Sequence, residues 1–328
     1  MRFKMKPITE SNMFRDSPNI SPPVGPTVTA ELPALSSAAS ARWQRLSDFY
    51  ELTKPRMNFL ILVTTLVGFY LASAKAPSTW LLLFHTLFGT ALTAASAAVL
   101  NQWLERRYDA LMPRTSQRPL PAGRIAPVEA LFFGAALGSV GVGHLLAFVN
   151  PLTAGLGLFT LLSYLLVYTP MKRYSTLNTI IGAVPGAIPP MMGFTAVENA
   201  ISPGAWVLFG VLFLWQMPHF LAIASLYRED YRLGGFKMLP VIDPSLTVTC
   251  RMVVLYTLTL IPITLLARPA GVSGAGYVIA AIILGLGFLW YGVKFYRTHQ
   301  RTDARKLFFA SIIYLPLLLG AMMIDRLG

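Results

Sequence analysis

Nine long apolar stretches recur along this chain, and each is long enough to cross a lipid bilayer as a helix. The hydrocarbon core of a bilayer is about 30 Å thick, which about 20 helical residues span. The composition agrees, because 55% of the residues are hydrophobic and 12% are charged, whereas ordinary soluble domains carry about 25% charged residues. We therefore predict an all-α, polytopic membrane protein. The predicted spans are residues 58–74, 79–100, 126–148, 152–168, 177–197, 204–226, 248–267, 273–293 and 307–324.

The positive charges predict how the chain is oriented. An odd number of spans leaves the two termini on opposite sides of the membrane. If the N-terminus is cytoplasmic, the inner segments and the adjoining helix start hold all 27 Lys and Arg residues except Lys75, Arg268 and Arg326. Because Lys and Arg favour cytoplasmic loops, we predict a cytoplasmic N-terminus. The net charge of +13 then reflects topology and phosphate binding, and no nucleic-acid partner is needed.

The chain divides by composition into two parts. Residues 1–50 are rich in Ser, Pro and Ala without a helical period, which predicts a disordered cytoplasmic tail. Residues 51–328 form one transmembrane domain, whose inner loops after the second and sixth spans are long. Such loops within a compact domain are usually functional. The single cysteine, Cys250, excludes an intramolecular disulfide and a cysteine-based metal site.

The first long loop is preceded by a short acidic cluster, NQWLERRYD at residues 101–109. If the second span continues as a helix, Asn101, Glu105 and Asp109 lie four residues apart on one face. Two neighbouring carboxylates repel unless a cation lies between them, and Mg²⁺ prefers carboxylates, waters and phosphate oxygens. We therefore predict that these three residues are catalytic metal ligands. The alternative is a solvated helix end whose acids pair with Arg106 and Arg107.

Arginines follow this cluster at a regular spacing. Arg114 and Arg118 would share a face if the segment is helical, and guanidinium groups bind phosphate through two parallel hydrogen bonds. We predict that both bind a phosphorylated substrate.

The second long loop also begins with acids, in YREDYR at residues 227–232, and we expect this cluster to continue the sixth span as a helix. Glu229 and Asp230 diverge on a helix, so we favour Asp230 as a metal ligand, with Glu229 supporting it through water or Arg228. Tyr227 and Tyr231 could orient a carboxylate by hydrogen bonding. The alternative for the tyrosines is an interfacial aromatic belt with arginines reaching the headgroups.

Two further segments carry candidate residues. Lys172 and Arg173 follow Pro170, which we predict ends the fourth span, and they suit either a diphosphate clamp or an ordinary positive flank. His219 lies at membrane depth and is a functional candidate by default, either touching substrate or bonding a neighbouring helix. His85 and His144 stand alone in apolar stretches and are interpreted as core or interfacial residues.

The segment NTIIGAVPGAIPPMMG, at residues 178–193, is unusually rich in Gly and Pro for a span. A broken helix at membrane depth is tolerated where it lines a cavity, which is the interpretation we favour. Small residues also allow helices to pack closely, and that alternative stays open.

Together these motifs resemble the membrane-embedded UbiA-type prenyltransferases, which carry two acid-rich motifs after helices 2 and 6 of a nine-helix fold. The combination is specific and covers residues 52–241. Glu105 stands where the family more often has Asp, Arg107 where an extra Asp is common, and Lys237 where a small residue or Pro is usual. The resemblance rests on LTKPR (52–56), residues 101–121, residues 168–193, WQMPHF (215–220) and YREDYRLGGFKMLPV (227–241).

Within the family, the chain is most similar to the members that transfer farnesyl from farnesyl diphosphate to a vinyl group of haem B, giving haem O for cytochrome oxidase. The resemblance implies nine helices around a central cavity, Mg²⁺ as cofactor, and a multi-pass protein of the bacterial inner membrane. It also implies a lipid-bilayer environment and a downstream enzyme that forms haem A. Haem propionates would need cationic partners, for which Lys54 and Arg56 are candidates.

Other functions remain as alternatives. The same fold could prenylate a quinone precursor such as 4-hydroxybenzoate, or another tetrapyrrole. A secondary transporter also uses broken helices, but its ion sites lie near the bilayer midplane, whereas these acids lie at the predicted inner rim. A haem chaperone that only binds would not need two acidic clusters.

Overall fold

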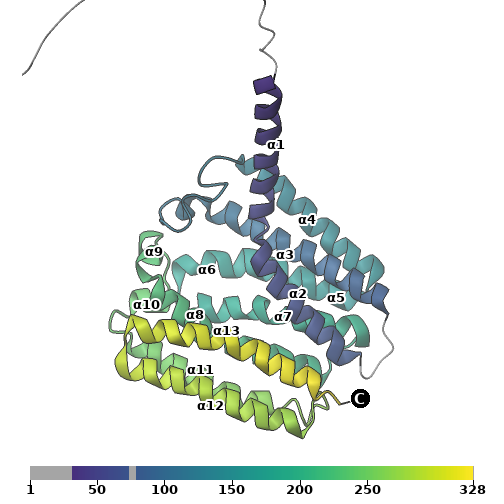
Figure 1. The fold of residues 1–328 in the computed structure, drawn as a ribbon, viewed down its shortest axis with the longest axis vertical. Helices are drawn as coiled ribbons and strands as arrows, with labels where there is room; N and C mark the ends of the chain where they lie inside the picture. Colours follow the sequence, from purple (N-terminus) through teal and green to yellow (C-terminus); the bar gives the residue numbers. More distant parts are fainter. Residues whose placement is uncertain (1–31, 74–78, 328) are drawn as a thin grey trace, which may run out of the picture. The chain divides into compact units, whose positions relative to one another are not determined.

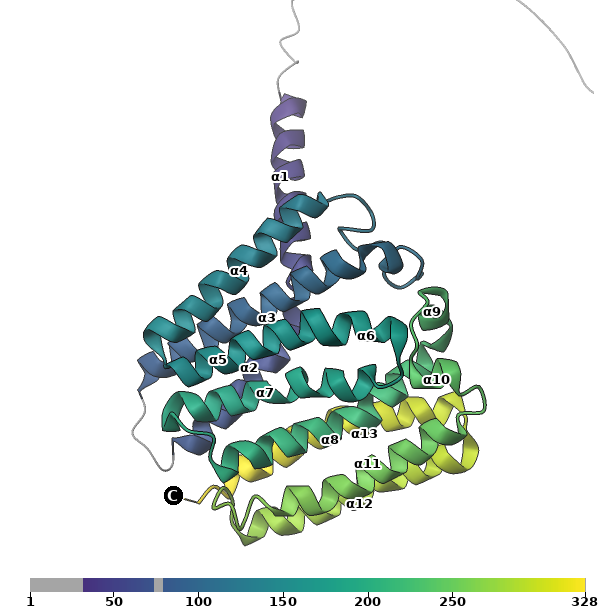
Figure 2. The same cartoon turned by 180° about the vertical axis from the view of Figure 1, so that it is seen from behind.

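The computed structural model describes residues 32–73 and 79–327, with side chains from residue 40 onward. Over these ranges the regular elements are helices, accompanied by one isolated β-bridge between Ser273 and Arg326. The chain separates into two compact units, residues 1–43 and 44–328. The second unit holds every predicted span (Figures 1 and 2).

The first helix differs from the sequence prediction. Helix α1 runs over Leu32–Leu52, where we expected a disordered tail up to residue 50; residues 1–31 of that tail lie outside the described residues. The segment contains Ala, Leu and Arg, which favour helix, and has its only proline near the first turn, where proline is tolerated. The side-chain amide of Gln102, on helix α3 (Trp80–Asp109), donates to the carbonyl of Leu52 over 2.7 Å. This hydrogen bond connects the end of α1 to α3.

The predicted number of spans is confirmed for the part of the chain that the structure describes. Nine helices there are long and apolar enough to cross a membrane, and the fourth is built from α5, a π-helical segment η1 and α6. The short helices α9 and α10 lie between the sixth and seventh. The bounds are α2 Pro55–Ala72, α3 Trp80–Asp109, α4 Pro127–Phe148, α5 Pro151–Leu162, η1 Ser163–Tyr168, α6 Thr169–Tyr174, α7 Asn178–Glu198, α8 Pro203–Leu226, α9 Arg228–Leu233, α10 Leu239–Ile242, α11 Thr247–Leu265, α12 Ala275–Thr298 and α13 Arg301–Ile324.

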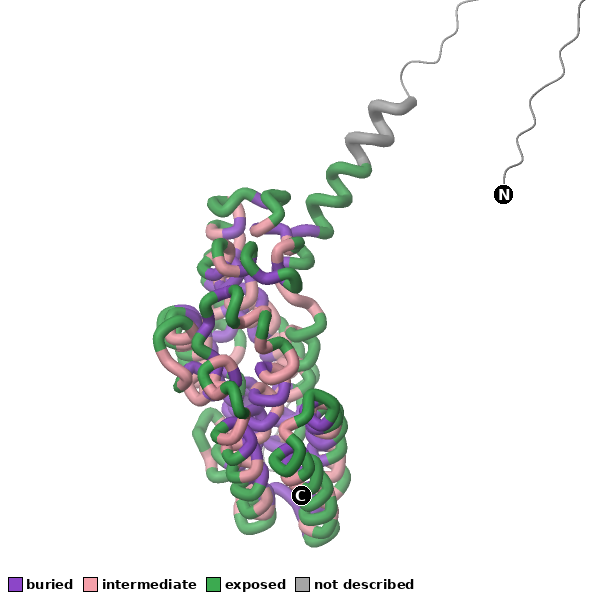
Figure 3. Tube along the Cα trace, turned by 90° about the vertical axis from the view of Figure 1, so that its left-hand side faces the viewer, coloured by how far each residue is buried: buried purple, intermediate pink, exposed green. Residues whose placement is uncertain are grey.

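The helices of the second unit pack as two groups joined through the middle of the bundle. Helix α3 packs against α4, and α11, α12 and α13 form the opposite group with α8. Helix α7 contacts α2 on one side and α8 on another, so it joins the groups (Figure 2). Buried positions gather between the helices (Figure 3). Apolar side chains such as those of Phe132 and Trp290 are exposed, as expected where lipid is the solvent.

The Gly- and Pro-rich segment forms an unbroken helix, α7, with Pro185, Pro189 and Pro190 inside it. A Cβ atom added to Gly193 would lie 2.0 Å from the carbonyl oxygen of Thr65 on α2. Glycine therefore lets the two backbones touch, which side chains of any size would prevent. Close packing is the correct interpretation at this position, and the broken helix that we favoured is wrong.

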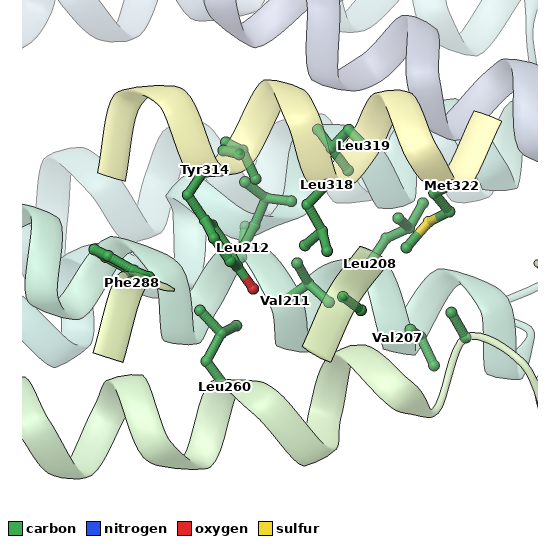
Figure 4. Packing of buried hydrophobic residues seen from close by; sticks show 14 of the residues in the cluster. Val207, Leu208, Val211, Leu212, Leu260, Phe288, Tyr314, Leu318, Leu319 and Met322 are labelled. Atoms are coloured by element: carbon green, nitrogen blue, oxygen red, sulfur yellow. The ribbon is translucent and has the colours of Figure 1, made fainter. Parts of the chain in front are cut away.

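The main hydrophobic core lies between α8, α11, α12 and α13 (Figure 4). Leu208, Val211 and Leu212 of α8 face Leu318 and neighbouring residues of α13, and all are almost fully buried. This core holds α8 in place, and the loop with α9 and α10 that comes after α8 contributes to the candidate site.

Candidate active site

The first acidic cluster lies on one face of α3, as the sequence predicts. Helix α3 has 30 residues, which corresponds to about 45 Å of helix against about 30 Å of hydrocarbon. Its last turns therefore lie near a membrane boundary and not at the midplane. Asn101, Glu105 and Asp109 on these turns are all buried, with 2%, 6% and 2% of their surface exposed.

Each buried acid has a cationic partner from another part of the chain. Lys172 Nζ lies 2.8 Å from Glu105 Oε1, and Arg118 Nη1 lies 2.8 Å from Asp109 Oδ2. The alternative in which these acids pair with Arg106 and Arg107 is wrong, because Arg106 bonds the carbonyl of Trp103 and Arg107 is exposed. Buried charges need such partners, since an unpaired carboxylate away from water is strongly unfavourable.

A third cation, Lys54, completes this group. It immediately precedes α2 with a positive φ of 48°, and its Nζ lies 3.5 Å from the side-chain oxygen of Asn101. Burial lowers the pKa of Lys54 to about 8, and the charges of Arg118 and Lys172 act in the same direction against the opposing effect of Glu105 and Asp109. The site thus concentrates positive charge that an anionic ligand would stabilise.

The π-helical segment η1 shapes the wall opposite α3. The hydroxyl of Thr169 donates to the carbonyl of Tyr164 over 2.8 Å, and the Asn101 amide donates to that hydroxyl over 3.0 Å. Lys172 Nζ lies 4.6 Å from the centre of the Tyr168 ring. Sequence reasoning missed Tyr164, Tyr168 and Thr169, because no hydrophobic period reveals a π-helical turn. Such turns are frequent at functional sites.

The second acidic cluster lies on a separate short helix. Helix α8 ends at Leu226, and Asp230 lies on α9, so our expectation that the cluster continues a membrane helix is wrong. The Arg114 Nε atom lies 4.0 Å from Asp230 Oδ2. The Arg114 guanidinium also covers the rings of Tyr227 and Tyr231, at 4.7 and 5.4 Å from their centres. The tyrosines thus contact a cation, and Arg114 connects the two acidic loops.

A small hydrophobic cluster brings the two loops together. It contains Met112, Ala224, Phe236 and Met238, with Tyr108 and Tyr231 packed against it. Tyr108 belongs to α3, and the Phe236 ring contacts both tyrosine rings edge-on at 6.2 Å. In both ribbon views α9 lies beside the loop that follows α3 (Figures 1 and 2). We call this end of the bundle, which carries Asp109, Arg118 and Asp230, the acidic end.

Four other predicted residues form no ion pair with the buried acids in the part of the chain that the structure describes. Glu229 is exposed and pairs with Arg232 over 2.8 Å. Arg228 donates to the carbonyl of Pro244, and Arg173 is exposed against the ring of Tyr108. Arg56 is exposed. Because the residues from 110 to 126 form turns, Arg114 and Arg118 do not share a helical face, and each therefore has a different partner.

His219 is held by helix α13. Its Nδ1 atom lies 2.7 Å from the hydroxyl oxygen of Ser311, and its ring stacks between Trp215 and Phe308 at 4.8 and 5.2 Å. Of the two interpretations of His219 given above, the hydrogen bond to a neighbouring helix is the one that describes this contact.

The donor atoms at the acidic end suit a hard divalent cation. Within residues 40–73 and 79–327, no three His, Cys, Asp or Glu side chains already form a metal-binding group. Asn101, Glu105 and Asp109 nevertheless offer oxygen donors, and the partners of the two acids are long, movable cations. Mg²⁺ is commonly bound by one or two carboxylates and substrate phosphates, without a complete protein cage. The residues therefore fit an ion that binds together with a phosphorylated substrate.

The fold and these contacts define a multi-pass membrane protein that gathers buried acids and cations at one end of a helical bundle. The chain matches the UbiA prenyltransferase family over residues 61–313 and belongs to that family. It is therefore a membrane-embedded prenyltransferase. Protoheme IX farnesyltransferase of Solibacter usitatus is 46% identical over 292 residues, covering 86% of this chain and 100% of the relative. Protoheme IX farnesyltransferase of Opitutus terrae is also 46% identical over 292 residues, covering 89% and 98%.

Solved structures share the fold at low sequence identity. A structure of digeranylgeranylglyceryl phosphate synthase matches with a TM-score of 0.74 and 18% identity, covering 86% of this chain and 98% of the other. An apo UbiA homologue from Aeropyrum pernix K1 gives 0.64 and 17%, covering 80% and 96%. A UbiA homologue from Archaeoglobus fulgidus, bound to GPP and Mg²⁺, gives 0.57 and 14%, covering 84% and 99%. These likenesses support the nine-helix prenyltransferase fold.

Proposed function

We propose that this chain transfers a farnesyl group from farnesyl diphosphate to a vinyl group of haem B, giving haem O and pyrophosphate. The donor chemistry is supported by one observation above all, the pairing of buried Glu105 and Asp109 with Lys172 and Arg118 at a membrane boundary. The acceptor is supported by the relatives named protoheme IX farnesyltransferase. We further propose a bacterial inner membrane location with this end of the bundle facing the cytoplasm, in line with the positive-inside distribution.

Mg²⁺ is the proposed cofactor, and Asn101, Glu105, Asp109 and Asp230 are the residues that would hold it. Bound together with the diphosphate, the ion would neutralise part of its negative charge and make pyrophosphate a better leaving group. We leave Glu229 out of this set, because its carboxylate is exposed and paired with Arg232.

The cations of the site would stabilise the charge that develops on the leaving pyrophosphate. Lys54, Arg114, Arg118 and Lys172 all lie at the acidic end, and preorganised cations act most strongly where water is restricted. Binding of diphosphate would give Lys172 and Arg118 new anionic partners and free Glu105 and Asp109 for the metal. The same residues would thus balance the buried charges both in the empty site and in the site with diphosphate bound.

The covalent step is a substitution at the first carbon of the farnesyl chain. The carbon–oxygen bond to the diphosphate breaks, its electron pair leaves with pyrophosphate, and an allylic cation remains. The π electrons of the haem vinyl group form the new carbon–carbon bond. Water then adds to the resulting cation and loses a proton, which gives the hydroxyethylfarnesyl side chain. The apolar interior between the helices restricts water while the allylic cation forms and while the new carbon–carbon bond forms.

Cations outside the diphosphate group are available for the acceptor. Arg56 is exposed near the start of α2 and is our candidate for binding a haem propionate. We assign Lys54 to the diphosphate, because its ammonium group lies beside Asn101. His219 shapes the apolar wall through Ser311 in this proposal.

The proposal is tested with purified protein in lipid nanodiscs supplied with farnesyl diphosphate, haem B and Mg²⁺. Extracted pigments are separated by chromatography and identified by mass. We expect haem O from the wild type and from Glu229→Gln, and none from Asp109→Asn, which should remain folded although losing the charge opposite Arg118 lowers its stability. Haem O formation by Asp109→Asn would contradict the site assignment. Prenylated 4-hydroxybenzoate in place of haem O would contradict the acceptor while leaving the donor chemistry intact.

A further inference from the structure

Two histidines that look isolated in the sequence meet between α3 and α4. His85 Nδ1 and His144 Nε2 lie 3.0 Å apart, and both side chains are partly buried. His85 lies near the start of α3 and Glu105 near its end, and the intervening helix is about 30 Å long. The pair is therefore remote from the prenyl-transfer site, and the proposed function does not use it.

The separation of the two ring nitrogens suits chelation of one metal ion. Metal–imidazole bonds are about 2.0–2.1 Å long, so two imidazoles in neighbouring positions of a tetragonal complex place their nitrogens about 3 Å apart. The observed 3.0 Å matches this arrangement. Two imidazoles on opposite faces of one haem would need about 4 Å by the same bond length, so the pair does not fit axial haem ligation.

The two helices that carry the pair pack closely beside it. A Cβ atom added to Gly89 of α3 would lie 2.6 Å from Leu145, and one added to Gly141 of α4 would lie 2.7 Å from the Thr93 hydroxyl. These close approaches flank His144 and hold α3 against α4. The close packing of α3 on α4 therefore limits how far the two backbones that carry the histidines can separate.

Aromatic contacts orient both imidazole rings. Phe148 stacks on His85 at 4.8 Å with an interplanar angle of 12°, and it contacts His144 at 4.7 Å. Phe88 meets the His144 ring edge-on at 5.0 Å, and Phe84 meets His85 at 5.6 Å. Ligands that are oriented before the metal arrives lose little entropy on binding.

We propose that His85 and His144 form a binding site for a single divalent transition-metal ion, with Cu²⁺ as the preferred occupant. Copper(II) stands at the maximum of the affinity order for nitrogen ligands and favours tetragonal geometry. Water or an external ligand would fill the remaining positions, since no third His, Cys, Asp or Glu joins the pair among the described side chains. The site would act independently of prenyl transfer.

The test is electron paramagnetic resonance of Cu²⁺ added in equal amount to protein without a histidine tag in nanodiscs. We expect one bound ion whose spectrum shows coupling to two imidazole nitrogens. His144→Gln keeps a hydrogen-bonding side chain beside His85 and should lose this signal while retaining the wild-type melting temperature. His299→Asn, which removes a histidine outside the pair at a position with φ of 52°, should retain the signal.

Stability gives a second readout that does not depend on the spectrum. Ligands that bind only the folded state raise its stability, so Cu²⁺ should raise the melting temperature of the wild type and of His299→Asn, but not that of His144→Gln or His85→Phe. An unchanged two-nitrogen spectrum in His144→Gln would overturn the proposal. Absence of the spectrum from the folded wild type would do the same and would leave the pair as an interhelical hydrogen bond.

Discussion

The ion pair between Lys172 and Glu105 gives the sharpest prediction about stability. Only 14% and 8% of the two side chains are exposed, and Nζ lies 2.8 Å from Oε1. Lys172→Met would leave a carboxylate buried without its partner, which typically costs about 3–5 kcal/mol. The variant also loses the contact between the ammonium group and the Tyr168 ring at 4.6 Å, worth about 0.5–2 kcal/mol. We expect the free energy of unfolding to fall by about 3.5–7 kcal/mol when both losses are counted.

A double variant separates stability from function. Lys172→Met combined with Glu105→Gln removes both charges, and replacing a whole buried pair is often neutral or stabilising. We therefore expect the double variant to recover to within about 1 kcal/mol of the wild type, yet to form no haem O, because both a metal ligand and a diphosphate cation are gone.

The measurement is unfolding in mixed micelles with increasing denaturing detergent, followed by tryptophan fluorescence for the wild type, both single variants and the double variant. A loss below about 1 kcal/mol for Lys172→Met, the range of exposed pairs, would refute the buried-pair reasoning. A double variant as unstable as Lys172→Met would refute the claim that the uncompensated carboxylate causes the loss.

Two further predictions concern packing and charge. Gly193→Ala should destabilise the protein by about 1–3 kcal/mol, because its new methyl group would meet the Thr65 carbonyl at 2.0 Å. Gly287→Ala, whose methyl group would meet nothing within 4 Å, is the control and should be neutral or slightly stabilising. Equal melting temperatures for these two variants would contradict the packing of α2 on α7. Burial is the main reason that the pKa of Lys54 is lowered to about 8 in the folded protein. In the unfolded chain the same lysine has its ordinary pKa of about 10.4, so between these two pH values only the unfolded chain holds the proton. The stability of the ligand-free wild type relative to Lys54→Met should therefore increase from about pH 8 towards pH 10, and a constant difference in melting temperature would contradict this.

The sequence predicted the helices well because the bilayer imposes a strong pattern. Each span needs a long apolar run with its backbone hydrogen bonds satisfied internally, so the nine runs alone located nine helices. The face with Asn101, Glu105 and Asp109 was predictable for a related reason, since a spacing of four residues requires only that α3 continues through them. Helix α1 escaped because serines and prolines obscured good helix formers.

Contacts between distant segments were not predictable from local patterns. Lys172 reaches Glu105 because the π-helical turn η1 and the packing of α5 on α7 set its position, and neither leaves a periodic signal. The cationic bridge from Arg114 to Asp230 depends on a hydrophobic cluster contributed by three segments. His85 and His144 looked like separate core residues because they are 59 positions apart in the sequence, although the close packing of α3 on α4 brings them together. The role of Gly193 depended in the same way on knowing which helix lies opposite.

The most direct test of the account concerns the metal at the acidic end. Mn²⁺ replaces Mg²⁺ as a paramagnetic probe, and an unreactive thiol analogue of farnesyl diphosphate replaces the donor. The account predicts that protein-bound Mn²⁺ is detected only when the analogue is present, that Asp109→Asn and Asp230→Asn each abolish it, and that Glu229→Gln does not. Undiminished Mn²⁺ binding in Asp230→Asn would show that α3 and α9 do not share one ion and would contradict the account.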